Sequence, residues 1–314
     1  DVLFMMLNTQ DTNVTEHKQF IEQTVKANSN CKWKVVSLHQ DIYGSAEHSN
    51  EPEIVNLRYS LTPYFEANGV DVVLTGHDHA YSRSKILKGG TATETSSSYT
   101  SSEFKSELNK DMDYSGEGTI YEAPKNIADD STDEADQKYL AYLNSIMDKD
   151  AVEDIVTEND TVMNPDGILY MTASSSSGSK YYDLVPRKQT YIANRWQEDV
   201  PTYSIIDVTG NSLTINTYRT DNDEKIDSSF TIVKGDTDKA NLKSAVNDAK
   251  KVVESNYTKA SYDVFSQAIS GAEKVLNNKK APKSEIENAI KALATAKSSL
   301  VEKTNISNAK ISEI

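Results

Sequence analysis

The sequence predicts an α/β layered fold followed by a C-terminal bundle of three helices. Three nearly continuous apolar runs rich in Val and Leu, at residues 2–7, 33–38 and 70–75, are typical of strands covered on both faces of a parallel sheet. Helical patterns separate these runs, and the order β-α-β-α-β implies right-handed crossovers between parallel strands. Three further helical patterns of similar length fill residues 238–303, and an up-down-up bundle is the natural arrangement for them.

Each helical pattern between the apolar runs places its apolar side chains on one stripe, as expected for a helix that packs on a sheet. The first stripe contains Val14, Ile21 and Val25, and the second contains Ile54, Leu57, Leu61, Tyr64 and Phe65. Asn68-Gly69 follows the second stripe and predicts a helix C-cap, because glycine readily adopts the left-handed conformation that ends many helices.

Residues 88–165 differ in composition from the segment before them, and we interpret them as an insertion. Residues 91–102 are rich in Ser and Thr, residues 135–147 have a helical pattern, and residues 148–160 contain many carboxylates. The carboxylates could bind calcium, but a solvated acidic face is the interpretation that we favour.

Strand patterns return after the insertion and predict the second sheet of the same domain. The predicted strands cover residues 168–172, 203–208, 212–218 and 229–233. Gly210-Asn211 lies between two of them and predicts a two-residue hairpin turn. The serine-rich segment 174–179 follows a strand end and is expected to be a flexible loop.

Residues 235–238 read as a linker to the bundle, and residues 304–314 read as a tail. Ser284 and Glu287 have capping-box spacing, and Pro282 lies near the expected start of the third helix. The apolar stripes of the three helices contain, in chain order, Leu242, Ala245, Val246, Ala249 and Val253; Tyr262, Phe265, Ile269, Ala272 and Leu276; and Ile286, Ala289, Ile290, Leu293 and Leu300.

The composition excludes some classes of partner. The formal net charge of -15 repels nucleic acid and anionic membrane surfaces, so we expect neither as a partner. It also repels a phosphate ester, so any phosphate-binding site must supply its own local positive charge. No run approaches 18 apolar residues, so no membrane-spanning helix is expected, and the single Cys31 forms no intramolecular disulfide.

The first residues read as a buried strand that begins abruptly. They have neither the basic segment nor the small-residue cleavage site of a signal peptide. We therefore expect that the natural protein starts upstream and that these 314 residues are a fragment of it.

Histidines mark the ends of two of the predicted strands. His39 directly follows residues 33–38, and His77 and His79 follow residues 70–75 in the sequence Gly76-His77-Asp78-His79. Ligands collect beyond the carboxyl ends of strands in α/β sheets, and neutral imidazole suits Zn, Fe and Mn. The pattern predicts a metal site at this edge.

Two other residues near this pattern also carry expectations. Gly76 is expected to let the backbone leave the strand sharply and approach a ligand closely. His17 falls within a helical pattern and is expected to be solvated.

A family resemblance rests on two segments of the sequence. They are residues 33–39 (Trp-Lys-Val-Val-Ser-Leu-His) and residues 70–83, which contain Gly-His-Asp-His-Ala-Tyr-Ser-Arg. Residues 1–234 resemble the C-terminal part of a calcineurin-like metallophosphoesterase of the bacterial branch that is similar to purple acid phosphatases. The resemblance implies an N-terminally truncated α/β sandwich. It also implies two metal ions, each Fe, Zn or Mn.

Carried over residue by residue, the resemblance implies that His39 and His77 bind one ion and that His79 binds the other. It implies that Asp78 orients the ligands rather than binding metal. Tyr43, Ser45 and His48 resemble the segment in which purple acid phosphatases keep a histidine near the leaving group. His48 is therefore a candidate phosphate contact or general acid, and a plain surface histidine is the alternative.

The family also has Asp-x-His, Gly-Asp-x-x-Tyr and Gly-Asn-His motifs, which supply the carboxylate side of the site. In this chain Gly235-Asp236 falls in the linker and Gly210-Asn211 in a hairpin, so neither substitutes for them. We expect the fragment to bind metal weakly and to turn over little.

Residues 238–303 resemble the FIVAR module, through their helix pattern and through Ala240-Asn241-Leu242 and Tyr257-Thr258. That resemblance implies a secreted or cell-surface protein of a Gram-positive bacterium, with the module as a spacer or as a contact to cell wall or carbohydrate.

The main functional hypothesis is a phosphoesterase that acts on a phosphomonoester or diester. The alternative is a non-catalytic surface protein in which a degenerate phosphoesterase fold mediates adhesion or carbohydrate contact. A nucleotidase ranks lower, because the sequence shows no obvious aromatic clamp for a base.

Overall fold

The computed structural model describes residues 2–11, 13–112, 120–153, 160–234, 237–278 and 281–303. The chain divides into two compact units. We call residues 1–162 and 167–231 the sheet unit, and residues 163–166 and 232–314 the helix unit.

A six-stranded sheet forms the centre of the sheet unit. Its first four strands run parallel, and β4 pairs antiparallel with both β6 and β7. Across the sheet the strands are β1 (Val2–Leu7), β2 (Trp33–Leu38), β3 (Val72–Thr75), β6 (Ile168–Ala173), β4 (Tyr81–Leu87) and β7 (Ile192–Trp196). The predicted parallel order of the first three strands is thus confirmed, while β4 and β7 were not predicted.

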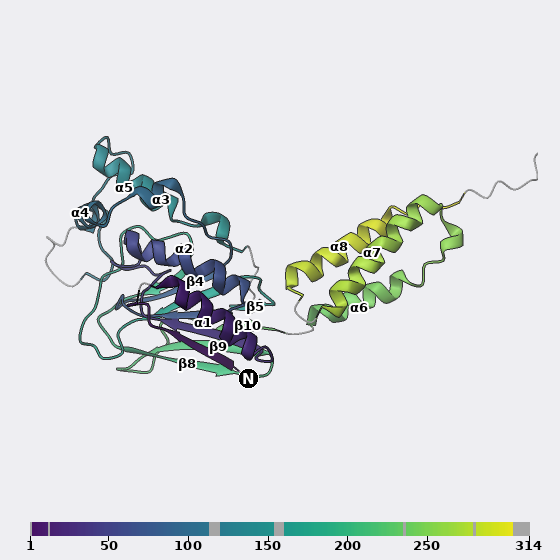
Figure 1. The fold of residues 1–314 in the computed structure, drawn as a ribbon, viewed down its shortest axis with the longest axis horizontal. Helices are drawn as coiled ribbons and strands as arrows, with labels where there is room; N and C mark the ends of the chain where they lie inside the picture. The colour runs from purple at the N-terminus through teal and green to yellow at the C-terminus, as the bar shows by residue number, and fades with distance from the viewer. Residues whose placement is uncertain are drawn as a thin grey trace, which may run out of the picture. The chain divides into compact units, whose positions relative to one another are not determined.

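Two helices, α1 (Val14–Ala27) and α2 (Pro52–Ala67), cover one face of this sheet (Figure 1). Ile21 of α1 and Leu61 and Phe65 of α2 are fully buried in the core cluster that they share with β1, β2 and β3. The predicted apolar stripes therefore point at the sheet. The C-cap prediction is also confirmed, because Asn68 caps α2 and Gly69 has a φ of +64°.

A second sheet of four strands has the order β5 (Thr161–Met163), β10 (Phe230–Val233), β9 (Ser212–Arg219) and β8 (Thr202–Val208). The backbone amide of Thr209 donates to the carbonyl of Ser212 at 2.8 Å, which confirms the two-residue hairpin. The prediction that residues 168–172 join this second sheet is wrong. That strand is buried on both faces and pairs in parallel with β3 in the middle of the larger sheet.

The segment predicted as an insertion packs as a helical layer with its own core. It contains α3 (Glu94–Ser98), α4 (Ser101–Met112), α5 (Glu134–Ser145) and the short η1 (Lys149–Ala151). Four aromatic side chains, those of Tyr99, Phe104, Tyr139 and Tyr142, are buried together in this core. The insertion is shorter than predicted, since β5 belongs to the second sheet.

The expected solvated acidic face is wrong at Asp148. Its carboxylate accepts hydrogen bonds from the hydroxyls of Tyr43 and Tyr59, each at 3.0 Å, and its side chain is 5% exposed. The carboxylates within residues 154–159 lie outside the described residues.

The helix unit contains three helices around an apolar core, as predicted: α6 (Thr237–Ala249), α7 (Lys259–Asn277) and α8 (Lys283–Ser298), with the short η2 (Glu254–Asn256) between the first two. The predicted capping box is wrong, because α8 begins after Pro282 and Ser284 already lies inside the helix. The predicted tail 304–314 lies outside the described residues. Of the helices described, none has the length and hydropathy needed to cross a bilayer.

Candidate metal and phosphate-ester site

Strands β2 and β3 bring His39 and His77 together at one edge of the larger sheet. The amide of Gly76 donates to the carbonyl of His39 at 3.0 Å, so the two strand ends stay paired where the histidines begin. The close approach of Gly76 to a ligand stays a prediction, but the left-handed residue at this turn is the next one along the chain. A Cβ on Gly76 would meet the carbonyl of His39 at an ordinary 3.7 Å, whereas His77 has the left-handed φ of +65°. Such backbone strain in a residue other than glycine is common at functional sites.

Three imidazole rings lie in contact at this edge. Nδ1 of His77 lies 3.2 Å from Nε2 of His39, and the ring centroid of His48 lies 4.5 Å from that of His77. Burial, together with the neighbouring His48 and His39, lowers the pKa of His77 to about 4. The ring of His77 is therefore neutral, which is the form that binds metals.

His79 and His48 both contact the ring of Tyr182. The ring centroid of Tyr182 is 4.9 Å from that of His48 and 5.3 Å from that of His79. Nδ1 of His79 is hydrogen-bonded to the carbonyl of Lys180 at 2.8 Å. A backbone carbonyl on one ring nitrogen is the usual way in which a metal-binding histidine is oriented. We call His39, His48, His77 and His79 the histidine cluster.

The spacing of the first two histidines fits a shared ion. Two imidazole nitrogens that bind one ion at about 2.0–2.1 Å lie roughly 3.3–3.4 Å apart when the angle at the ion is near tetrahedral. The 3.2 Å between His39 and His77 is close to that value. Within the described ranges, however, no group of three or more His, Cys, Asp or Glu side chains is arranged to hold one ion.

The ring of His48 is paired with a carboxylate. Its Nδ1 lies 2.8 Å from a carboxylate oxygen of Glu51, and this hydrogen bond raises the pKa of His48 even though partial burial opposes it. A raised pKa keeps more of the ring protonated near neutral pH. The contact with His77 places the ring of His48 beside the histidine pair.

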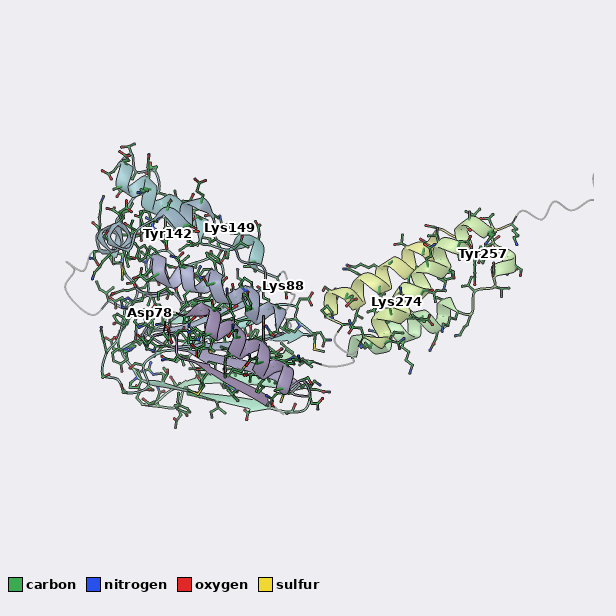
Figure 2. The ribbon with its side chains drawn as sticks, in the orientation of Figure 1. Asp78, Lys88, Tyr142, Lys149, Tyr257 and Lys274 are labelled. Atoms are coloured by element: carbon green, nitrogen blue, oxygen red, sulfur yellow. The ribbon has the colours of Figure 1, made fainter. Side chains whose placement is uncertain are left out.

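Asp78 holds the backbone that carries His48. Its carboxylate accepts from the amides of His48 at 3.1 Å and Ser49 at 3.0 Å, and also from the Ser49 hydroxyl. The same hydroxyl lies 3.2 Å from the carboxylate of Asp41. Burial raises the pKa of both carboxyls, that of Asp41 to about 8, with the charge of Asp78 as the second cause for Asp41. Figure 2 labels Asp78 within the sheet unit.

Arg58 is a second support of the same loop, and it was not predicted. Its fully buried guanidinium donates to the carbonyls of Ile42, Ser49 and Ile146, and it lies 3.6 Å from the carboxylate of Asp148. The sequence carried one signal: Arg58 lies between Ile54 and Leu61 on the apolar stripe of its helix.

Three other residues singled out from the sequence, Tyr43, Ser45 and His17, form hydrogen bonds to groups outside the histidine cluster. The Tyr43 hydroxyl bonds Asp148, and the Ser45 hydroxyl bonds the side chain of Gln189 at 2.8 Å. The expectation for His17 is wrong: it is 8% exposed, and its Nε2 lies 2.9 Å from the carbonyl of Asp11.

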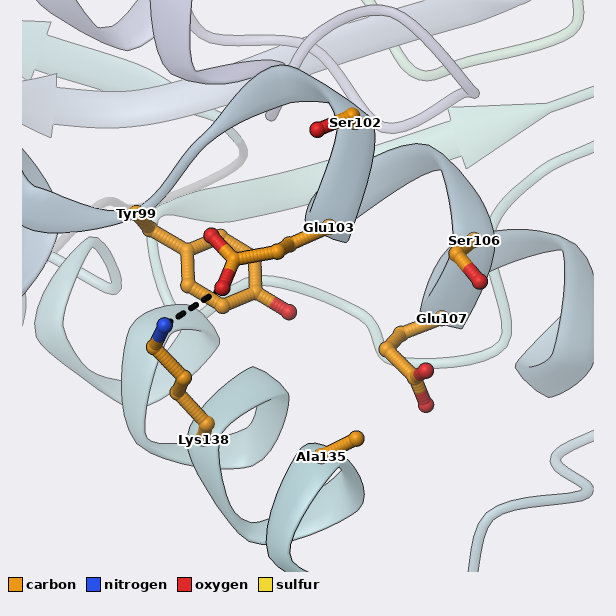
Figure 3. Close-up of a pocket in the computed structure, with 7 residues that line it drawn as sticks. All are labelled: Tyr99, Ser102, Glu103, Ser106, Glu107, Ala135 and Lys138. Atoms are coloured by element: carbon orange, nitrogen blue, oxygen red, sulfur yellow. Dashed lines mark hydrogen bonds and ion pairs between the residues drawn. The ribbon is translucent and has the colours of Figure 1, made fainter.

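Surface depressions of about 280 and 350 Å³ lie in and beside the insertion. The smaller one, between α4 and α5, is crossed by the ion pair of Lys138 and Glu103 (Figure 3). None of the four clustered histidines lines either depression.

Comparison with known proteins agrees with both resemblances. Residues 4–81 match the model of the calcineurin-like phosphoesterase family, and residues 238–301 match the FIVAR domain model. The first segment is therefore similar to calcineurin-like phosphoesterases. It contains His39, His48, His77 and His79, so the whole cluster lies within the matched range.

Two relatives among known proteins match shorter stretches of this chain. An uncharacterised protein of Mycobacterium tuberculosis is 34% identical over 70 residues, which cover 22% of this chain and 13% of that protein. Purple acid phosphatase 4 of Arabidopsis thaliana is 43% identical over 51 residues, which cover 16% of this chain and 14% of that protein. The chain thus spans only a small part of the length of these relatives.

Among solved structures, a purple acid phosphatase from yellow lupin seeds (Lupinus luteus) has a TM-score of 0.42 and 13% identity. That match covers 73% of this chain and 30% of the lupin chain.

Proposed function

We propose that the sheet unit is a metal-dependent phosphoric ester hydrolase and that three members of the histidine cluster, His39, His77 and His79, are the imidazole ligands of a two-metal site. One observation carries the proposal. Within a segment that matches calcineurin-like phosphoesterases, His39 and His77 face each other at 3.2 Å where two adjacent parallel strands end. In this proposal His39 and His77 hold one ion and His79 holds the other, each ion being Fe, Zn or Mn.

The chain's own residues would divide the work around a phosphate ester. When bound, the metal ions polarise phosphoryl oxygens and lower the pKa of water. His48 would hold the proton that the departing ester oxygen takes, since its hydrogen bond to Glu51 raises the pKa of the ring. Asp78 would keep His48 in place through the loop amides that it accepts from.

We further propose that the ligand set is incomplete in these 314 residues. Among the residues that the structure describes, the paired imidazoles have no third His, Cys, Asp or Glu arranged to complete a ligand set. An ion held by two imidazoles and water binds weakly. The chain by itself should therefore bind metal weakly and hydrolyse phosphate esters slowly.

Metal titration tests the ligand assignment. We expect isothermal titration of the 314-residue chain with Zn²⁺ to show weak binding, and His77→Ala to weaken it by about tenfold or more. His17→Gln is the matched control, because it removes a histidine outside the cluster while keeping a side-chain amide for the Asp11 carbonyl. Equal zinc affinity of His77→Ala and the unchanged chain would contradict the assignment.

Hydrolysis of p-nitrophenyl phosphate with added Zn²⁺ or Mn²⁺ tests the reaction. The small rate expected from the chain should vanish in His77→Ala and persist in His17→Gln. The alternative, a non-catalytic adhesion protein with a degenerate phosphoesterase fold, predicts that the two variants and the unchanged chain behave alike.

We also propose a location outside the cell, on a Gram-positive bacterium. FIVAR modules are typical of cell-surface proteins, and residues 238–301 match that module. The helix unit would then be a spacer or a contact to cell wall or carbohydrate.

A further inference from the structure

The loop after β6 brings two side chains to the histidine cluster from about 100 residues further along the chain. The ring of Tyr182 contacts those of His48 and His79, at 4.9 and 5.3 Å between centroids. The ammonium of Lys180 lies 4.3 Å from the centre of the Tyr182 ring and is hydrogen-bonded to its hydroxyl. The loop thus places a positive charge next to the rings.

This placement is fixed by the fold. The buried side-chain amide of Gln197 donates to the carbonyls of His79 and Tyr182, each at 2.7 Å. The neighbouring Leu184 is buried with Ala46 and Ala80, which flank the two histidine segments. One amide and one small apolar cluster therefore hold the loop against both segments of the site.

The negative charge near the histidine cluster indicates a role for the Lys180 ammonium. Glu47 and Glu51 add negative charge on the His48 side, and the chain as a whole carries -15. An anionic substrate that approaches the cluster meets this field, and a cation at the entrance offsets it. Lys180 is exposed, so its ammonium can reach an incoming phosphate without leaving a buried partner unpaired.

Resting on the function proposed above, we propose that Lys180 contacts the phosphate of the substrate and that Tyr182 is the residue that positions it. The substrate class that this arrangement favours is a phosphomonoester. A monoester carries close to two negative charges near neutral pH, whereas a diester carries one, so a single ammonium at contact distance attracts the monoester more strongly.

Binding measurements test this inference on the 314-residue chain. With Zn²⁺ present, we expect Lys180→Met to weaken the affinity for phenyl phosphate by about tenfold, and that for methyl phenyl phosphate by much less. The tenfold loss should shrink at high salt. Tyr182→Phe, which keeps the ring and loses the hydroxyl, should show a smaller loss than Lys180→Met.

The controls separate a substrate contact from a structural role. Lys180→Met keeps the backbone carbonyl that orients His79, so zinc affinity should not change. Lys243→Met removes the same charge from an exposed position of α6 and should leave phenyl phosphate binding unchanged.

Two results would overturn the inference, and they differ in what they say about the proposed function. If phenyl phosphate binds and His77→Ala loses that binding while Lys180→Met matches Lys243→Met, Lys180 is not a substrate contact and the proposed site stands. If the chain binds no phenyl phosphate at millimolar concentration, the inference fails, and the zinc titration then decides the proposed function separately.

Discussion

The helix unit and the sheet unit differ most in what they bury. The core of the helix unit consists of apolar side chains such as Phe265, Ile286 and Leu293. In the part of the chain that the structure describes, none of the buried polar or charged residues lies in the helix unit. Many of those groups, Arg58, Asp41 and Asp78 among them, surround the loop that carries His48.

This difference shows that the sheet unit depends on the geometry of particular polar contacts and not on the burial of apolar side chains alone. An apolar core tolerates changes that conserve volume, because its contacts are not directional. A buried guanidinium or carboxylate is tolerated only while its particular partners remain. The loop 41–50 is therefore held by directional bonds, and the helix unit by packing.

Among the substitutions that test this difference between the units, the largest loss of stability is expected at Arg58. Arg58→Met should destabilise the sheet unit by about 3–5 kcal/mol, because Asp148 would keep a buried charge without its counterion. Both tryptophans, Trp33 and Trp196, lie in the sheet unit, so urea unfolding followed by tryptophan fluorescence reports on this unit.

The double variant Arg58→Met, Asp148→Leu provides the control. It removes both charges and should recover part of the lost stability, since no uncompensated carboxylate remains. A double variant that is less stable than Arg58→Met would show that the ion pair is not the reason for the effect.

A smaller effect, with a defined pH dependence, is expected at Asp227. Burial alone would raise the pKa of Asp227, but Arg83, whose Nε lies 2.6 Å from it, lowers the pKa overall. Asp227→Asn should therefore lose about 1.5–3 kcal/mol at neutral pH, the usual value for a hydrogen bond to a charged group.

The sign of the pH dependence follows from the lowered pKa. A carboxyl that is more acidic in the folded state stabilises the fold above its unfolded pKa of about 3.9 and loses that contribution as pH falls through the folded pKa. The difference in unfolding free energy between the unchanged chain and Asp227→Asn should accordingly be constant above pH 5 or so and shrink below about pH 4. A difference that grows on acidification would contradict the assignment.

The same contrast explains what the sequence could predict. The apolar strands and the stripes of α1, α2, α7 and α8 were predictable, because each repeats a simple period. Strand β4 was missed because Ser82, Arg83 and Ser84 are buried in it, and the partner that permits this, Asp227, lies 144 residues from Arg83.

The candidate site was predictable in the same limited way. His39, His77 and His79 directly follow predicted strands, so local sequence indicated them, whereas His48 was indicated by the resemblance of its segment to purple acid phosphatases. Arg58 and the Lys180–Tyr182 pair depend on contacts between distant segments, and no local pattern encodes those contacts.

The smallest expected effect lies in the helix unit. Ile286 is fully buried at the start of α8, and Ile286→Val removes one methylene from an apolar core, which should cost about 0.5–1.5 kcal/mol. Since the tryptophans lie in the sheet unit, the loss should appear in the helical signal of circular dichroism and leave the fluorescence transition in place. A fluorescence transition that shifts by the same amount would show that the two units unfold together. In that case Arg58→Met should also shift the unfolding of the helix unit, and the two variants together would measure how strongly one unit depends on the other.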